Sequence, residues 1–288
     1  MTEVADIPVP VRYVADLLAA AARSGHPSPP VRDLLAPGDI DAAYAVQRLN
    51  TERALSAGSR LVGRKIGLTS SAVQRQLGVD QPDYGALLSD MAVDQGGEVP
   101  PGRLLQPKVE AEVALILAAG LSDERCTVED VVAATGFAVP ALEIVDSRIA
   151  GWDISLMDTV ADNASSGLFV LGDARVPVDE VDLRTVRMTM SRNGDVVSEG
   201  TGADCLGSPL EAAVWLARTL ARLGDPLRAG DIVLTGALGP MAPAAPGDTF
   251  DASVSGLGSV RVGFAPRSAD DFADDFADDS TGEGAADE

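Results

Sequence analysis

The stretch 105-LQPKVEAEVALIL-117 decides how the fold and the site of this chain are interpreted. Its apolar second half predicts a strand over Val109–Leu117 that ends buried. Because side chains alternate between the two faces of a strand, Glu110 and Glu112 project from the same side. Two parallel carboxylates repel each other, and burying either one unpaired is costly. One of them must therefore be protonated, or a cation must lie between them.

A third glutamate, Glu143, lies in an equally apolar frame, 139-VPALEIV-145. Three carboxylates without histidine or cysteine nearby suit a hard ion such as Mg²⁺ or Mn²⁺, which leaves its remaining positions to water or substrate oxygens. Zinc is disfavoured because His26, the only histidine, precedes a proline in a predicted loop. The residues alone leave one alternative open, an exposed strand face beside Lys108.

Two further charged residues stand in unusual frames. Lys65, in 61-LVGRKIGLT-69, is either a surface lysine with a packed stem or, beside carboxylates and a metal, a cation that stabilises an enolate or carboxylate of a substrate. Asp83, in 80-DQPDYG-85, ordinarily forms a turn and alternatively serves as an acid or base. The polar run 158-DTVADNASSG-167 lines a pocket or caps a helix, and its spacing does not decide between the two.

Composition limits the class of protein. With 288 residues and 46% hydrophobic content, the chain can bury a full core. A formal net charge of −22 argues against nucleic acid and anionic membranes as partners, because both would repel it. No apolar run reaches about 18 residues, so no membrane span is expected. Cys126 and Cys205 give no disulfide framework, and the acidic, proline-broken N-terminus is unlike a secretory leader, so we expect a reducing cytoplasm.

Residues 268–288 have a composition of their own. They repeat a DDFA unit and hold nine acidic residues and no basic one. This composition predicts a disordered, solvating tail, with a motif for a specific partner as the alternative.

The rest of the chain divides into a helical start and a β-rich remainder. Helices are predicted over Val11–Arg23 and from Ile40 to about Ala57, the second with Asp39 as its N-cap. They make an N-terminal helical cap of residues 1–58, and residues 59–267 form a β-rich domain. A late helix is predicted to begin at 208-SPLE-211, where a capping box meets a proline at the first helical position.

Short apolar runs bounded by Gly, Pro and Asp predict the strands of this domain. They are Leu61–Leu68, Val109–Leu117, Phe137–Val145, Phe169–Gly172, Val186–Arg192, Val196–Glu199, Ile232–Thr235 and Ser253–Val262. Asn193-Gly194 predicts a tight type I′ hairpin. Strands without regularly alternating helices indicate an α+β fold with a rolled or sandwich-like β core, not a doubly wound sheet.

Six stretches taken together resemble one family. They are GRKIGLTS (63–70), QLGVDQPDYG (76–85), LLQPKVEAEVALIL (104–117), PALEIVDSRI (140–149), DTVADNASSG (158–167) and LTGALGPM (234–241). In this order, over about residues 10–264, the chain resembles the 2-keto-4-pentenoate (2-hydroxypenta-2,4-dienoate) hydratases of bacterial meta-cleavage pathways. These belong to the fumarylacetoacetate hydrolase superfamily, so the resemblance implies a helical cap on the mixed, rolled β-sheet core of that superfamily's C-terminal domain.

The resemblance also implies roles for single residues. In such hydratases a divalent ion is held by the glutamates of an E-x-E strand and an A-L-E-x-V strand, here Glu110, Glu112 and Glu143. Lys65 and Asp83 look like the groups that handle charge and protons in a catalytic domain over residues 59–267, and Ser165 resembles a substrate-binding serine. A homo-oligomer and a downstream aldolase are implied as well.

The implied activity is metal-dependent hydration of 2-hydroxypenta-2,4-dienoate, or an alkyl homologue, to 4-hydroxy-2-oxopentanoate. The nearest alternative is a 2-oxo-3-hexenedioate (4-oxalocrotonate) decarboxylase, although the quoted motifs offer no obvious extra basic residue for its second carboxylate. A C–C hydrolase is disfavoured because His26 is poorly placed to activate water. A catalytically silent scaffold that uses the acidic tail as its contact is the third alternative, against which the complete set of charged residues argues.

Overall fold

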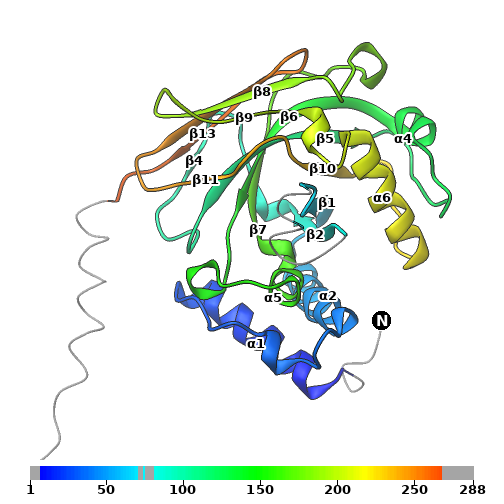
Figure 1. Ribbon diagram of the computed structural model, residues 1–288. Helices are drawn as coiled ribbons and strands as arrows, with labels where there is room; N and C mark the ends of the chain where they lie inside the picture. Colours follow the sequence, from blue (N-terminus) through cyan, green and yellow to red (C-terminus); the bar gives the residue numbers. More distant parts are fainter. Residues whose placement is uncertain (1–6, 71–73, 75–80, 268–288) are drawn as a thin grey trace, which may run out of the picture.

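Two curled sheets and a helical end make up the part of the chain that the computed structural model describes, residues 7–70, 74 and 81–267. In Figure 1 the five-stranded sheet lies at the top, helices α1 (Val9–Ser24), α2 (Ile40–Ser56) and α5 (Leu156–Ala161) lie at the bottom, and the larger sheet lies between them. The predicted disorder of the tail 268–288 lies outside the described residues. Within those residues, none of the helices combines the length and apolarity needed to cross a bilayer.

The larger sheet has eight strands and carries the residues that the sequence singled out. Its order is β2 (Asp83–Leu88), β1 (Leu61–Gly67), β10 (Ile232–Ala237), β5 (Lys108–Leu117), β6 (Thr135–Val145), β7 (Ser166–Leu171) and β3 (Ala92–Val93), with β11 (Ala242–Pro243) pairing β5. β1 and β10 run parallel, as do β3 and β7, and the other neighbours are antiparallel. The sheet is therefore mixed, as expected.

The smaller sheet has five strands, in the order β4 (Glu98–Val99), β13 (Gly258–Phe264), β12 (Thr249–Val254), β8 (Arg187–Arg192) and β9 (Asp195–Thr201). Asn193 and Gly194 have φ of 55° and 91°, which confirms the predicted I′ turn between β8 and β9. The single strand predicted over Ser253–Val262 is wrong. It is a hairpin of β12 and β13, turned where Gly256 and Gly258 take positive φ that other residues rarely adopt.

The helical end has its own apolar cluster, formed mainly by α1, α2 and α5. Asp39 caps α2 by accepting the Ala42 N–H, as predicted, and Gly25 ends α1 in the left-handed conformation. The buried Asp158 of α5 accepts the N–H groups of Val31 and Arg32 at 2.7 and 2.8 Å, which ties the loop after α1 to this helix. The two predicted helices thus form a cap, while the domain boundary at residue 58 stays a prediction.

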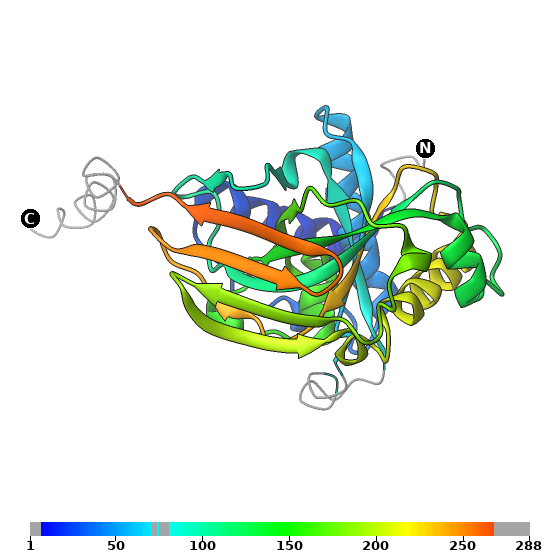
Figure 2. The ribbon, with the colours of Figure 1, turned by 90° about the horizontal axis from the view of Figure 1, so that it is seen from above.

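Among the described residues, two further helices pack together against the sheet far from this cap. They are α4 (Val128–Ala134) and α6 (Pro209–Arg222). Figure 2 shows them at one end of the molecule, with β13 running toward the other end. Ser208 caps α6 by accepting the Leu210 N–H, and Pro209 is its first residue, as predicted, but Ser208 forms no reciprocal capping box with Glu211. Cys126 and Cys205 are both buried and unpaired.

Short 3-10 turns complete the described elements. They are η2 (Arg32–Leu34), η3 (Ser89–Met91), η4 (Ala150–Trp152), η5 (Asn163–Ser165), η6 (Val178–Glu180) and η7 (Gly202–Asp204). Two of them, η4 and η5, border the pocket described next.

Candidate metal centre and active site

The three glutamates predicted from the sequence lie together. Glu110 and Glu112 project from one face of β5, and Glu143 of β6 lies opposite Glu110 in the strand register. One carboxylate oxygen from each lies within 4.8 Å of the others. All three side chains are buried, Glu112 and Glu143 completely. The alternative of an exposed strand face is therefore wrong.

The donor set fits a hard divalent cation. The Gly236 N–H donates to Glu112 Oε2 at 2.8 Å, but Glu112 Oε1 and Glu143 Oε2 have no hydrogen-bond partner among the described residues. Buried carboxylate oxygens without partners are costly, and a cation with oxygen ligands removes that cost. With three carboxylates and no nitrogen or sulfur donor in the cluster, the chemistry favours magnesium or manganese over zinc.

The electrostatics of the cluster agree with this assignment. Burial raises the pKa of Glu110 to about 7, with Glu143 adding to the shift and Lys65 opposing it. Burial and the neighbouring carboxylates likewise raise the pKa of Glu112, and burial raises that of Glu143. Carboxylates held this close in a dry site resist ionising together unless a positive charge joins them.

Lys65 supplies the one ammonium group among the described residues of this cluster. It lies on β1, is 2% exposed, and its Nζ is 3.1 Å from Glu143 Oε1. Burial lowers its pKa, but Glu143, Asp83 and the other carboxylates raise the pKa by more, so that Lys65 stays protonated. Its low exposure shows that the alternative of a surface lysine is wrong. The sequence left that alternative open because a period-2 pattern does not reveal that both faces of β1 are covered.

Asp83 is the first residue of β2, opposite Gly67 of β1, rather than a turn residue. It is 1% exposed, and burial raises the pKa of its carboxyl while Lys65 opposes the shift. A Cβ at Gly67 would lie 2.2 Å from Asp83 Oδ1 and 3.5 Å from Lys65 Nζ. The glycine thus leaves the space in which these two groups approach each other, and Asp83 Oδ1 is buried without a hydrogen-bond partner.

Ser165 lines the pocket from an unusual turn. Asn163, Ala164 and Ser165 have φ of 55°, 52° and 52°, so three successive non-glycine residues adopt the left-handed conformation. Such strain persists only where surrounding contacts hold it. Asn163 exchanges hydrogen bonds with the N–H and C=O of Ala86 on β2, and the Ser165 hydroxyl lies 3.1 Å from that of Thr159. The polar run 158–167 therefore both lines the pocket and forms helix α5.

Lys65, Asp83, Glu110 and Ser165 line one small cavity of about 100 Å³ and supply its polar wall. Glu112 and Glu143 do not line it, but each has a carboxylate oxygen within 4.8 Å of one of Glu110. The other wall of the cavity is apolar and comes from residues that sequence reasoning missed: Val145, Trp152, Ile154 and Met241. Nothing in the sequence marks these four residues as pocket residues, because single apolar residues in loops and at strand ends resemble ordinary core residues. Ligand pockets for drug-sized molecules span about 300–1,000 Å³, so this cavity suits a much smaller substrate.

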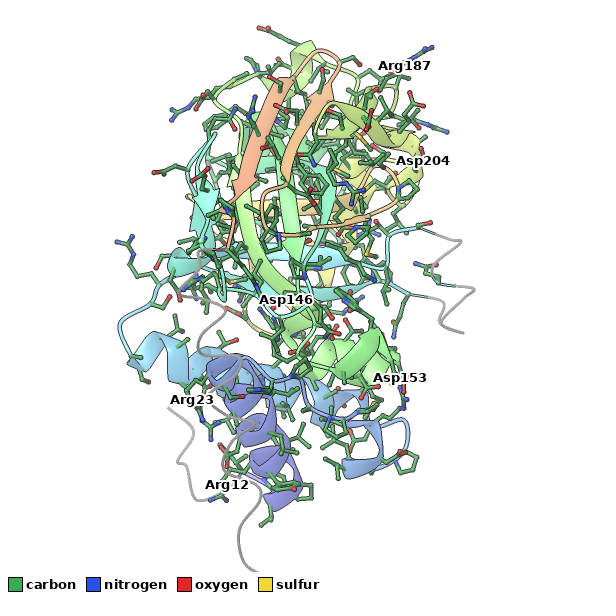
Figure 3. The ribbon with its side chains drawn as sticks, turned by 90° about the vertical axis from the view of Figure 1, so that its left-hand side faces the viewer. Arg12, Arg23, Asp146, Asp153, Arg187 and Asp204 are labelled. Carbon is green, nitrogen blue, oxygen red and sulfur yellow. The ribbon has the colours of Figure 1, made fainter. Side chains whose placement is uncertain are left out.

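A hydrogen-bond network holds the site against the cap. The Asp146 carboxylate accepts the N–H groups of Leu105 and Gln106, which fixes the segment before β5. Figure 3 shows Asp146 where the strands meet the helical end. Gln47 of α2 donates to the carbonyls of Tyr84 and Val160 at 3.0 Å each, so the cap also fixes the residue next to Asp83.

Comparison with known proteins now identifies the class. The model of the fumarylacetoacetate (FAA) hydrolase C-terminal family matches residues 66–265. The chain is 60% identical over 251 residues to 2-keto-4-pentenoate hydratase 2 of Dechloromonas aromatica strain RCB, covering 87% of this chain and 96% of that one. The chain therefore belongs to the fumarylacetoacetate hydrolase superfamily and, within it, to the 2-keto-4-pentenoate hydratase family.

Two further relatives bear on the site. The chain is 41% identical over 249 residues to 2-hydroxyhexa-2,4-dienoate hydratase of Comamonas testosteroni, covering 86% of this chain and 94% of the relative. A solved structure of 4-oxalocrotonate decarboxylase from Pseudomonas putida G7, complexed with magnesium and adipate, superposes with a TM-score of 0.84 at 37% identity. That match covers 88% of this chain and 97% of the decarboxylase.

Proposed function

We propose that this chain adds water to 2-hydroxypenta-2,4-dienoate, or to a short alkyl homologue, and releases the corresponding 4-hydroxy-2-oxo acid. The observation that supports it most is the cluster of three buried carboxylates beside Lys65 and Asp83 at one small cavity. The relatives named hydratases, up to 60% identical over most of the chain, support the same reaction.

The reaction needs an electron sink next to the carbon that water attacks. Removing the proton from the 2-hydroxyl and adding one at C5 converts the 2-hydroxydiene into a 2-oxo-3-ene. Conjugation with the new carbonyl makes C4 electrophilic. Water then bonds to C4 through its oxygen while C3 gains a proton, so that one water is consumed for each diene. No nucleophilic serine or cysteine is required.

Four sets of residues divide this work. Glu110, Glu112 and Glu143 would hold Mg²⁺ or Mn²⁺. When bound, such an ion supplies Lewis-acid stabilisation of negative charge on the 2-oxygen and the C1 carboxylate of the substrate. The fixed charge of Lys65 stabilises the same negative charge from within a dry site, where it acts without solvent reorganisation.

Proton transfer falls to Asp83 and orientation to Ser165. Asp83 Oδ1 is buried, unpartnered and beside Lys65, so it is the atom we assign to hold and return the proton. The paired hydroxyls of Ser165 and Thr159 orient the substrate at the polar wall of the pocket. A homo-oligomer and an aldolase that cleaves the product remain predictions.

A decarboxylase is the second candidate, because the solved decarboxylase shares 37% identity at a TM-score of 0.84. Its substrate, 2-oxo-3-hexenedioate, carries a carboxylate more than the hydratase substrate does. A basic residue that would pair with this second carboxylate is Lys108 of the motif 104–117, whose place near the pocket is described below.

One assay separates the candidates. Purified protein with Mg²⁺ or Mn²⁺ is given freshly generated 2-hydroxypenta-2,4-dienoate or, separately, 2-oxo-3-hexenedioate, while dienol absorbance and CO₂ are followed. We expect loss of the dienol and formation of 4-hydroxy-2-oxopentanoate from the first substrate. Release of CO₂ from the second without hydration of the first would reject the hydratase. Inactivity on both with metal bound would favour a scaffold.

A further inference from the structure

A second, larger concavity adjoins the catalytic pocket. This outer groove has a volume of about 650 Å³ and is bordered by the end of α1, by proline-rich segments at 100–101 and 243–246, and by Phe264 of β13. Trp152 lines both the outer groove and the catalytic pocket. The indole is fixed in place, because its Nε1–H donates to the Gln106 carbonyl at 3.0 Å. The outer groove and the catalytic pocket therefore meet at the Trp152 side chain.

Basic residues line the outer groove of this acidic protein. Its lining includes the basic side chains of His26, Lys108 and Arg267 and, among the described residues that line it, no aspartate or glutamate. The whole chain has 44 acidic residues against 22 lysines and arginines. A basic groove in an acidic protein concentrates anions locally, because the potential of a cleft is set mainly by the charges that line it.

Lys108 is the basic residue of the outer groove that contacts Trp152, the residue shared with the catalytic pocket. It precedes Glu110 and Glu112 by two and four residues on β5, so its side chain leaves the same face of the strand. Its Nζ lies 4.0 Å from the centre of the Trp152 ring, a cation–π contact. Lys65 and Lys108 are the only lysines in the sequence, and one lies inside the pocket while the other lies at its outer wall.

An anionic ligand that approaches the catalytic pocket is helped by a positively charged group outside it. The pocket and the cluster beside it hold four carboxyl groups, of Asp83, Glu110, Glu112 and Glu143, and one ammonium group, of Lys65. A site with more acidic than basic groups does not attract a carboxylate from a distance, so a basic group outside it favours the approach of an anion. The half-buried side chain of Lys108 supplies such a group.

We propose that the outer groove is a binding site for the carboxylate of short apolar acids on their way to the catalytic pocket, and that Lys108 is its anion-binding residue. The identity of the acid as a 2-hydroxydienoate rests on the proposed function, whereas the anion site itself does not. Lys108 binds the carboxylate first and Trp152 guides the apolar chain inward. The carboxylate then exchanges Lys108 for the interior of the pocket.

The test uses a ligand that cannot react. 2-Oxopentanoate has no carbon–carbon double bond to hydrate, so it binds without turnover, and Trp215→Phe leaves Trp152 as the only tryptophan to report binding by fluorescence. In this background, with Mg²⁺ present, we compare Lys108→Met, Lys108→Arg and Arg187→Met. Arg187→Met removes the same charge from an exposed residue that Figure 3 places at the end of the molecule opposite the helical cap.

We expect Lys108→Met to lower the association rate constant of 2-oxopentanoate, measured by stopped-flow fluorescence, about tenfold and to weaken the salt dependence of that rate. Lys108→Arg should stay within about twofold of the parent, as should Arg187→Met. If Lys108→Met unfolds, Lys108→Gln replaces it. Equal association rate constants for Lys108→Met and Arg187→Met, or a tenfold loss in Lys108→Arg, would overturn the proposal.

Turnover gives an independent readout. With a hydratable substrate, Lys108→Met should raise KM about tenfold and leave kcat within about twofold, because Lys108 acts before the chemical step. A fall in kcat with unchanged KM would also overturn the proposal. If the protein hydrates no dienoate but its 2-oxopentanoate binding depends on Lys108, the proposed function fails while the anion site stands.

Discussion

The two sheets differ in what they bury. The eight-stranded sheet encloses five charged side chains around one pocket, while the five-stranded sheet, over its described strands, buries no charged residue at all. Its inner face is apolar instead, with Met188, Met190, Phe250, Ala252, Val260 and Val262. Burial of charged groups destabilises the folded state, whereas burial of apolar groups stabilises it. The smaller sheet therefore stabilises a fold whose larger sheet is specialised for chemistry.

The largest expected effect is the loss of activity when one metal-binding carboxylate of the larger sheet is removed. We expect Glu110→Gln to lose metal binding and activity together, with kcat/KM reduced by roughly 10³-fold, because a neutral amide replaces a charged oxygen ligand. Calorimetry with Mn²⁺ and the hydration assay measure the two effects. Wild-type metal affinity in this variant would show that the cage is assigned wrongly.

In the smaller sheet, truncation of a large buried side chain should lower stability strongly and leave activity unchanged. Phe250 is fully buried, and Phe250→Ala should lower the free energy of unfolding by about 3–4 kcal/mol, the cost of a large cavity. Its kcat at a temperature where it is folded should match wild type. Phe169→Ala is the matched variant, because Phe169 is equally buried but pairs with Glu143 across β6 and β7. Equal kcat values for both variants would contradict the functional difference between the sheets.

Substitution of Lys65 should separate the effect on catalysis from the effect on metal binding within the larger sheet. Lys65→Met keeps the length of the side chain but removes the charge beside Glu143. We expect kcat to fall roughly 10²-fold, the scale of one lost electrostatic contact in a transition state, while Mn²⁺ still binds. Steady-state kinetics and a metal titration test it together. Full activity in Lys65→Met would remove this residue from the mechanism.

The smallest expected effect is a gain in stability. Glu112 is fully buried, with Oε1 unpartnered, and Glu112→Gln retains an oxygen for the Gly236 N–H without adding a buried charge. In the metal-free protein we expect unfolding in urea to cost about 1 kcal/mol more than in wild type. Glu199→Gln, on the exposed side of β9, is the control and should change little. If metal-free Glu112→Gln is less stable than wild type, the buried carboxylate does not destabilise the metal-free fold.

Sequence patterns predicted most of the larger sheet and its charged residues, because period-2 alternation and interrupted apolar frames are local signals. Glu110, Glu112 and Glu143 came from such frames, and the structure brings them together as expected. That they lie opposite each other depends on the register of β5 and β6, which spacing alone does not give.

Other features depended on contacts distant in sequence. The left-handed turn at Asn163–Ser165 is held by Ala86, far away along the chain, so its local sequence resembles an ordinary polar loop. Strand β2 was missed because 80-DQPDYG-85 carries strong turn signals, whereas pairing with β1 makes Asp83 a strand residue. Trp152 and Met241 reach the pocket only through the fold.

The most direct measurement of the central claim is the position of a bound ion. Crystals of the protein grown with Mn²⁺ and examined by anomalous scattering should show one strong peak between the carboxylates of Glu110, Glu112 and Glu143. A peak at another place, or none between these carboxylates at saturating Mn²⁺, would contradict the assignment of this buried cluster as the metal centre.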